Sequence, residues 1–244
     1  MMKQKIQSAP TIFYPESDGK PMAETDKHRD LMVDFIQMLQ RHFRDDPVYV
    51  SGNLLMYYEQ GNPKKSVSPD VFVVFGVSKK QRRTYLTWEE SKTPDFVLEL
   101  ASPSTFREDL RRKKALYESV LSVKEYYIYD PYGEINPNFI GFRLTNGVYE
   151  EITFVDDRLP SDVLNLELGE HGGILRLFDP STEQWLQPPP ERVEHAEERA
   201  QHAEERAQHA EERAQQESVA RQNIEAELAK ALLEIEQLRE KFDS

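Results

Sequence analysis

The chain contains no cysteine among its 244 residues, and this absence excludes several kinds of site. Without thiols it can have no disulfide framework, no thiolate metal site and no cysteine nucleophile. It also lacks any run of about 18 apolar residues, the length that a transmembrane helix requires. Residues 1–17 lack the apolar core of a signal peptide. We therefore expect a soluble, cytoplasmic protein with no membrane partner.

Positive charge is scarce overall but concentrated in one segment. The formal net charge of −13 would disfavour nucleic acid as a partner if it were spread evenly. Residues 191–244 hold 15 acids and 8 bases, whereas residues 64–114 hold 12 Lys or Arg and only 7 Asp or Glu. The acidic balance therefore lies outside this central segment, and an apolar content of 38% supports one sizeable domain plus an appendage.

Two short apolar runs, 68–76 and 94–102, each contain one acid in their interior. Their β-branched and aromatic residues, bounded by Pro, Gly and Ser, predict buried strands that carry Asp70 and Glu99. Two carboxylates about 4 Å apart near a surface repel each other by about 4 kcal/mol at an effective dielectric of about 20. A divalent cation removes that cost, so the pattern predicts a magnesium or manganese site.

A helix is expected after the second run, from near Thr105 to about Val120. Asp109, Lys113 and Tyr117 are spaced four residues apart and so share one face of this helix. Lys113 can then reach toward Glu99. The alternative is a surface Asp–Lys pair, which contributes only a few tenths of a kcal/mol.

The remaining pattern predicts further helices and strands around these two runs. A helix capped by Thr25 or Asp26 should extend to about Phe43, with Glu24 at its start either as an extra acid near the metal or as part of a charged first turn. A hairpin is expected at Asn146-Gly147, and another turn at Gly52-Asn53. The expected strands are 48–51, 54–58, 125–130, 139–144, 149–154, 163–168, 175–178 and 183–186.

Basic residues that could contact a phosphate backbone occur in three groups. A basic cluster close to aromatic residues such as Tyr85 and Trp88 can hold phosphates and stack on a base. The alternative is that such residues simply solvate exposed loops. The candidate contacts are Lys64, Lys65, Lys79, Lys80, Arg82, Arg83, Arg111 and Arg112.

The end of the chain has a different composition. A Pro-rich linker, 188–192, precedes a heptad sequence that repeats at positions 195, 202 and 209. Alanine and then Ile or Leu recur at alternating spacings of three and four, which predicts a coiled coil over 193–242. We expect a homo-oligomer, a dimer formed through the head, the coiled coil or both. A single solvated helix with Glu–Arg pairs is the alternative.

Several motifs, in this order along the chain, resemble the Uma-two family, which is grouped with the restriction-endonuclease-like folds of the PD-(D/E)XK nuclease superfamily. They are segments 23–30, 51–54, 68–76, 95–105 and 125–131, with Lys113 and Tyr117. The resemblance covers about residues 20–187. It implies an α/β fold with a mixed central sheet flanked by helices over 23–187, after a lead-in segment 1–22 and before the C-terminal coiled-coil helix.

The resemblance also implies roles for individual residues. The superfamily pattern has Pro-Asp, then an acid, one residue and a Lys; Pro69-Asp70 and Glu99 match, whereas Ala101 stands where the Lys is expected. Lys113 is the matching position in this family, and would orient the attacking water or offset charge.

Asp70, Glu99 and the Leu100 carbonyl would bind Mg²⁺ or Mn²⁺, with Glu24 and Tyr117 as accessory residues. The expected function is metal-dependent endonucleolytic hydrolysis of DNA. The alternative is a catalytically inactive nuclease-fold protein that binds nucleic acid or a partner and assembles through its coiled coil.

Overall fold

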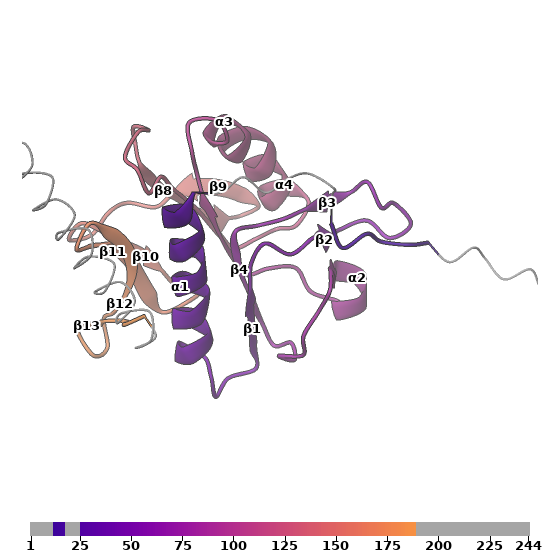
Figure 1. The fold of residues 1–244 in the computed structure, drawn as a ribbon, viewed down its shortest axis with the longest axis horizontal. Helices are drawn as coiled ribbons and strands as arrows, with labels where there is room; N and C mark the ends of the chain where they lie inside the picture. Colours follow the sequence, from indigo (N-terminus) through magenta and orange to yellow (C-terminus); the bar gives the residue numbers. More distant parts are fainter. Residues whose placement is uncertain (1–11, 18–24, 189–244) are drawn as a thin grey trace, which may run out of the picture. The chain divides into compact units, whose positions relative to one another are not determined.

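The computed structural model describes residues 12–17 and 25–188, which form a mixed α/β structure (Figure 1). Its strands belong to a six-stranded, a four-stranded and a three-stranded sheet. No helix in this part of the chain is long and apolar enough to cross a membrane. Glu24, the predicted coiled coil 193–242 and the linker beyond Pro188 lie outside the described residues.

The six-stranded sheet contains both predicted acid-bearing strands at its centre. Its order is β1 (Val48–Ser51), β4 (Val71–Phe75), β6 (Phe96–Leu100), β7 (Glu125–Tyr129), β8 (Phe139–Thr145) and β9 (Val148–Glu151). Only β6 and β7 run parallel, and the helical segment between them makes the crossover that a parallel pair requires. The other neighbouring pairs are antiparallel.

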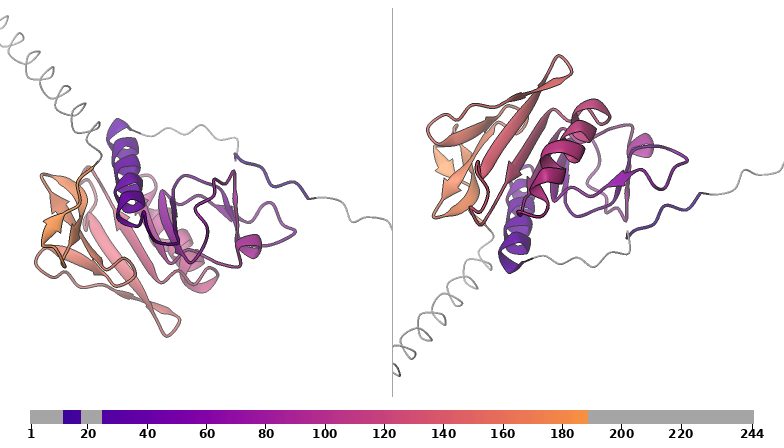
Figure 2. Two further views of the ribbon diagram at one scale, coloured as in Figure 1. Left: turned by 90° about the horizontal axis from the view of Figure 1, so that it is seen from below. Right: turned by 90° about the horizontal axis from the view of Figure 1, so that it is seen from above.

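Each face of this sheet is covered by one helical element and one smaller sheet (Figure 2). One face packs on α1 (Asp26–His42) and the four-stranded sheet of β10 (Arg158–Ser161), β11 (Leu166–His171), β12 (Ile174–Asp179) and β13 (Gln184–Trp185). The other face packs on α4 (Lys114–Ser119) and the three-stranded sheet of β2 (Met56–Tyr57), β3 (Ser66–Val67) and β5 (Tyr85–Leu86). A short helix, α2 (Thr87–Glu90), follows β5.

Side chains of β4 alternate between these two cores as the sequence predicts. Val71 and Val73 lie in the core that contains α1, and Phe72 and Val74 lie in the opposite core. Both faces are therefore buried, which explains why β4 and β6 read as nearly continuous apolar runs.

The hairpin predicted at Asn146-Gly147 is confirmed. Asn146 and Gly147 have φ of 53° and 84°, as a two-residue turn with positive φ at both positions requires, and they join β8 to β9. A second tight turn at Gly172-Gly173 joins β11 to β12, where the ring of His171 stacks on Trp185 at 4.8 Å. His171 therefore has a packing role.

The hairpin expected at Gly52-Asn53 is wrong, because β1 pairs with β4 and β2 pairs with β3 and β5. Long-range contacts decide this turn: the Asn53 N–H donates to the Pro69 carbonyl at 2.8 Å. A Cβ on Gly52 would lie 1.9 Å from the Asp70 carbonyl oxygen. The turn packs directly against the segment that carries the first acid.

Other boundaries also differ from the sequence prediction. The strand expected over 54–58 is only Met56–Tyr57, and the one expected to begin at Val163 begins at Leu166, after a turn at Asn165 with φ of 54°. β3, β5, β10 and α2 were not predicted.

Replacing Gly52 by alanine tests the close approach to Asp70. We expect Gly52→Ala to lower the free energy of unfolding by about 3 kcal/mol, since the added methyl group meets main-chain atoms that cannot rotate away. Gly147→Ala is the control: its Cβ meets open space, so only the cost of positive φ remains, about 1 kcal/mol. Urea denaturation of both variants measures the difference, and equal losses would contradict the steric argument.

Candidate active site

Asp70 and Glu99 lie next to each other on the antiparallel pair β4 and β6. Asp70 directly precedes β4, whose first residue, Val71, pairs with Leu98. The Leu100 N–H donates to Asp70 Oδ2 at 2.8 Å, and the Asp70 N–H lies 3.4 Å from Glu99 Oε2. The two strands therefore fix the two carboxylates relative to each other through main-chain groups.

The segment after β6 brings two more side chains onto Glu99. Lys113 Nζ lies 2.9 Å from Glu99 Oε2, so the predicted reach of this lysine is found in the structure. Lys113 Nζ is also 2.9 Å from Asp109 Oδ1. The Tyr117 hydroxyl donates to Glu99 Oε1 at 2.6 Å. Each oxygen of Glu99 thus has its own partner.

The helix that carries Lys113 is not uniformly α-helical. Between α3 (Phe106–Glu108) and α4, residues Asp109–Lys113 form a π-helical turn. The Asp109 carbonyl accepts from the Lys114 N–H and from the Tyr126 hydroxyl, the latter at 3.1 Å from β7. π turns within helices recur at functional sites. This one begins at Asp109 and ends at Lys113, the two residues that form an ion pair.

His28 approaches the acids from the other face of the sheet. It lies in the first turn of α1, where its N–H donates to the capping hydroxyl of Thr25 at 3.3 Å. Its Nε2 is 3.6 Å from Asp70 Oδ2. The sequence analysis did not assign His28 or Asp109 to the site. The cap at Thr25 was a signal for His28, and the four-residue spacing to Lys113 was a signal for Asp109.

Burial controls the electrostatics of this cluster. The Glu99 side chain is fully buried, whereas those of Asp70, His28 and Lys113 are each 17% exposed. Burial raises the pKa of Glu99 to about 8; Lys113 opposes this rise, and the charges of Asp70 and Asp109 add to it. Burial also raises the pKa of Asp109, against the attraction of Lys113.

For Asp70 and Lys113, neighbouring charges outweigh burial, so that both side chains are kept in their charged forms. Burial disfavours the charge of Asp70, but the attraction of His28 and Lys113 outweighs it and lowers its pKa. Burial likewise disfavours the ammonium of Lys113, but Glu99, Asp109 and Asp70 outweigh it and raise its pKa. The cluster therefore holds a permanent cation, an ionised Asp70 at its open side and a protonatable Glu99 beneath.

The donors suit a hard divalent cation, although they do not form a complete cage. No group of three or more His, Asp or Glu side chains in 12–17 and 25–188 is arranged to hold a metal. Carboxylate oxygens of Asp70 and Glu99 are the ligands that Mg²⁺ prefers, with water and substrate completing its shell. The raised pKa of Glu99 marks a place where added positive charge is favourable. A cation would share Glu99 with Lys113.

The predicted phosphate contacts do not gather at one place. Asp70 precedes β4 and Lys79 follows it, so residues 79–83 come from the opposite end of this strand. Lys79 Nζ donates to the carbonyls of Phe43 and Arg44, where α1 ends. Lys80 lies 3.0 Å from Glu90, and Arg83 lies 2.6 Å from Glu16.

Arg82 is buried instead of facing solvent. Its side chain is 3% exposed, donates twice to Glu90 at 2.8 Å, and lies over the Tyr49 ring at 4.0 Å. This geometry gives Arg82 a structural role between β1 and α2.

The other predicted contacts are exposed. Lys64 and Lys65 lie in the loop between β2 and β3. Arg111 and Arg112 are on the same π-helical turn as Lys113, and Arg112 pairs with Glu108. Of the predicted basic residues, these two arginines share an element with the candidate site.

Arg82→Gln should reveal the structural role of that arginine. We expect the free energy of unfolding to fall by about 2 kcal/mol or more, because Glu90 and the Tyr49 ring lose a buried partner. Arg83→Gln, at a side chain that is 82% exposed, should change little. Thermal and urea unfolding of the two variants provide the comparison; similar stability would argue against a structural role.

The pKa of Glu99 predicts a pH dependence of stability in the presence of a chelator. Between the unfolded value of about 4.3 and the folded value of about 8, the folded chain keeps a proton that the unfolded chain has lost. Raising the pH through this window therefore lowers the free energy of unfolding, by up to about 1.4 kcal/mol per pH unit for one proton.

Glu99→Gln removes that titration. The difference in unfolding free energy between the parent protein and this variant should fall as pH rises from 6 to 8, measured by urea denaturation in EDTA. A difference that does not change with pH would contradict the raised pKa.

Comparison of the chain with known protein families identifies the family to which it belongs. A family model named Uma2 and described as "Putative restriction endonuclease" matches residues 7–175. The chain belongs to this family, as the resemblance in the sequence predicted. The match includes Asp70, Glu99 and Lys113.

A solved structure is also similar, and is described as "a putative nuclease belonging to DUF820" from Anabaena variabilis ATCC 29413. The similarity covers 61% of this chain and 81% of the other, with 14% sequence identity and a TM-score of 0.44. A search of curated proteins finds no match.

Proposed function

We propose that the protein is a divalent-metal-dependent endonuclease with a restriction-endonuclease-like fold that hydrolyses DNA phosphodiester bonds. The observation that carries this proposal is the contact of Lys113 Nζ with Glu99 Oε2 at 2.9 Å, beside Asp70 on the neighbouring strand. Membership of a family described as "Putative restriction endonuclease" supports it. The three side chains combine oxygen ligands and a fixed cation, the groups that phosphodiester hydrolysis needs.

Asp70 and Glu99, with the Leu100 carbonyl, would hold the metal. A bound Mg²⁺ polarises a phosphodiester and lowers the pKa of water, which supplies a nucleophile at neutral pH. Asp70 is the ligand at the open side, since its side chain is 17% exposed and ionised. Tyr117 fixes the other end of Glu99 by its hydrogen bond to Oε1.

Lys113 acts as a cation in this proposal. Its pKa is raised by the three carboxylates around it, so at neutral pH it cannot accept a proton as a general base. Its ammonium can instead donate a hydrogen bond to the attacking water or to a phosphate oxygen, where negative charge develops. Asp109 holds Lys113 in place from the π turn and is a positioning residue.

Ala101 explains why the lysine comes from the helix. The residue is buried at 1% exposure, and its N–H donates to the Tyr129 carbonyl at 2.7 Å. It belongs to the apolar core on the same face as Tyr117. Lys113 supplies, from the next element, the charge that the superfamily pattern has at this position.

One observation favours the alternative, a nuclease-fold protein that binds nucleic acid without cleaving it. Both oxygens of Glu99 already accept a hydrogen bond or an ion pair, from Tyr117 and Lys113. In that case the ion pair replaces the metal, and binding persists in the presence of a chelator.

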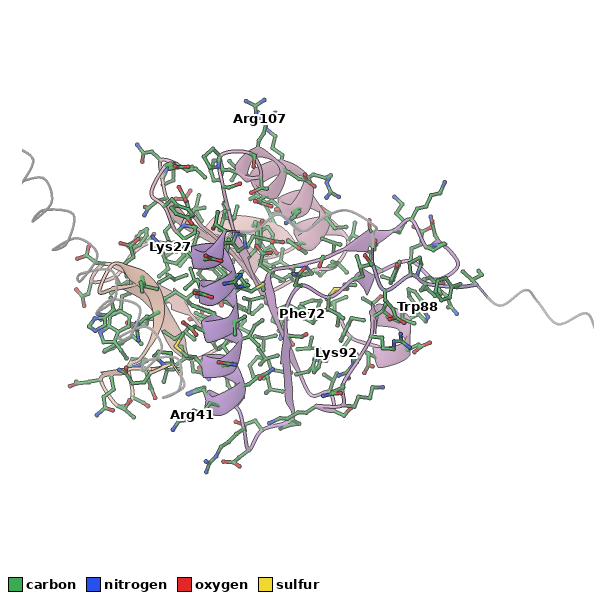
Figure 3. All side chains as sticks on the ribbon, viewed as in Figure 1. Lys27, Arg41, Phe72, Trp88, Lys92 and Arg107 are labelled. Carbon is green, nitrogen blue, oxygen red and sulfur yellow. The ribbon has the colours of Figure 1, made fainter. Side chains whose placement is uncertain are left out.

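Cleavage of plasmid DNA and of single-stranded DNA with Mg²⁺ or Mn²⁺ decides between the two functions. We expect cleavage by the parent protein to stop in EDTA, and Asp70→Asn and Lys113→Met to reduce its rate by about a hundredfold or more. Lys92→Gln is the matched control, because Lys92 (labelled in Figure 3) is exposed, follows α2, and pairs with Asp95 and not with Asp70 or Glu99. Unchanged cleavage by Asp70→Asn would refute the proposed site, and absence of metal-dependent cleavage by the parent protein would favour the alternative.

A further inference from the structure

The loop that leaves β7 presents an exposed aromatic ring in a fixed main-chain setting. Asp130, 2% exposed, follows β7, and its carboxylate accepts the N–H groups of Tyr132 at 2.9 Å and Ile135 at 2.7 Å. These two hydrogen bonds determine the course of the loop. Tyr132 nevertheless remains 47% exposed.

Lys27 ties this ring to the start of α1. Its Nζ lies 5.0 Å from the centre of the Tyr132 ring and also donates to the Pro131 carbonyl. Figure 3 shows Lys27 at the N-terminal end of α1. A cation at this distance is attracted to the ring and orders its orientation.

Both residues come from elements that reach the candidate site. Lys27 immediately precedes His28, whose Nε2 is 3.6 Å from Asp70 Oδ2. Pro131 and Tyr132 follow Tyr129, which pairs with Leu100 at the end of β6. The ammonium group therefore belongs to the helix whose next residue contacts Asp70, and the ring belongs to the loop that follows the strand paired with β6.

We propose that Tyr132 and Lys27 form a nucleotide subsite beside the acid cluster, in which the ring stacks on an unpaired base and the ammonium contacts a phosphate. The proposal rests on the proposed function and names its substrate class, single-stranded DNA. Aromatic rings bind single strands by stacking, and a neighbouring cation adds attraction to the backbone. In a duplex each base is already stacked on its neighbours, so the ring has no free base face to bind.

The subsite is tested with the full-length protein in EDTA, which separates binding from cleavage. The probe is a fluorescein-labelled 20-nucleotide single strand, with the duplex of the same sequence as competitor. We expect Tyr132→Ala to weaken single-strand binding by about 5- to 100-fold, the range for loss of one base–aromatic stack. Tyr132→Phe should stay within about twofold of the parent protein, and Lys27→Met should bind more weakly with a reduced salt dependence.

Phe13→Ala is the matched control, because Phe13 is another exposed aromatic residue, 75% exposed and far from Asp70 in the chain. A strand containing 2-aminopurine adds a readout specific for stacking: its fluorescence should be quenched by the parent protein and by Tyr132→Phe but not by Tyr132→Ala. Equal affinity of Tyr132→Ala and the parent protein, preference for the duplex, or no binding of the single strand would overturn the subsite. Binding that depends on Tyr132 without any metal-dependent cleavage would support the subsite and refute the nuclease activity.

Discussion

The buried carboxylate of Glu99 is the interaction around which the site is organised. A charge in this position is unfavourable unless it is paired and hydrogen-bonded, and Glu99 has no contact with solvent. Lys113 and Tyr117 satisfy one oxygen each. These two contacts hold the helical segment that follows β6 against β6 itself. The interactions that stabilise the buried acid therefore also fix the position of the lysine.

The rest of the site depends on close main-chain packing. Asp70 is oriented by the Leu100 N–H, and the chain at Gly52 lies so close to the Asp70 carbonyl that no side chain fits between them. Asp109, from the π turn, holds Lys113 on its other side. Five elements thus contribute side chains to one small cluster: the segment before β4, β6, the π turn, α4 and α1.

The sequence predicts the parts that depend on local pattern. The two apolar runs predict β4 and β6, the Asn146-Gly147 turn predicts the last hairpin of the large sheet, and the spacing from Asp109 to Tyr117 places three side chains on one helix face. Gly52-Asn53 also resembles a hairpin turn, but this turn packs against Pro69 and Asp70, which are remote in sequence. The sequence did not predict the π turn either, and the Tyr126 hydroxyl that donates to its Asp109 carbonyl comes from β7, outside the helix.

The roles of the basic residues also depend on contacts that the local sequence does not reveal. A cluster of positive charge predicts phosphate contact, yet the partner of each base is set by the fold: Arg82 meets Glu90 and an aromatic ring, whereas Lys79 meets the end of α1. Lys27, which is outside the predicted basic groups, instead lies over the ring of the exposed Tyr132 and directly precedes the histidine that contacts Asp70. Clustering in the sequence therefore locates charge but not its role.

The charges within the site also constrain how a metal and a substrate would enter on the proposed function. With all groups ionised, Asp70, Glu99 and Asp109 outnumber Lys113 by two negative charges, which a divalent cation would balance. In the absence of such a cation, the raised pKa of Glu99 reduces this imbalance through partial protonation. Metal binding would then release a proton from Glu99, since a carboxylate ligand must be ionised. The phosphate of the substrate adds a further negative charge, which Lys113 is already placed to meet because its ammonium is held by two carboxylates.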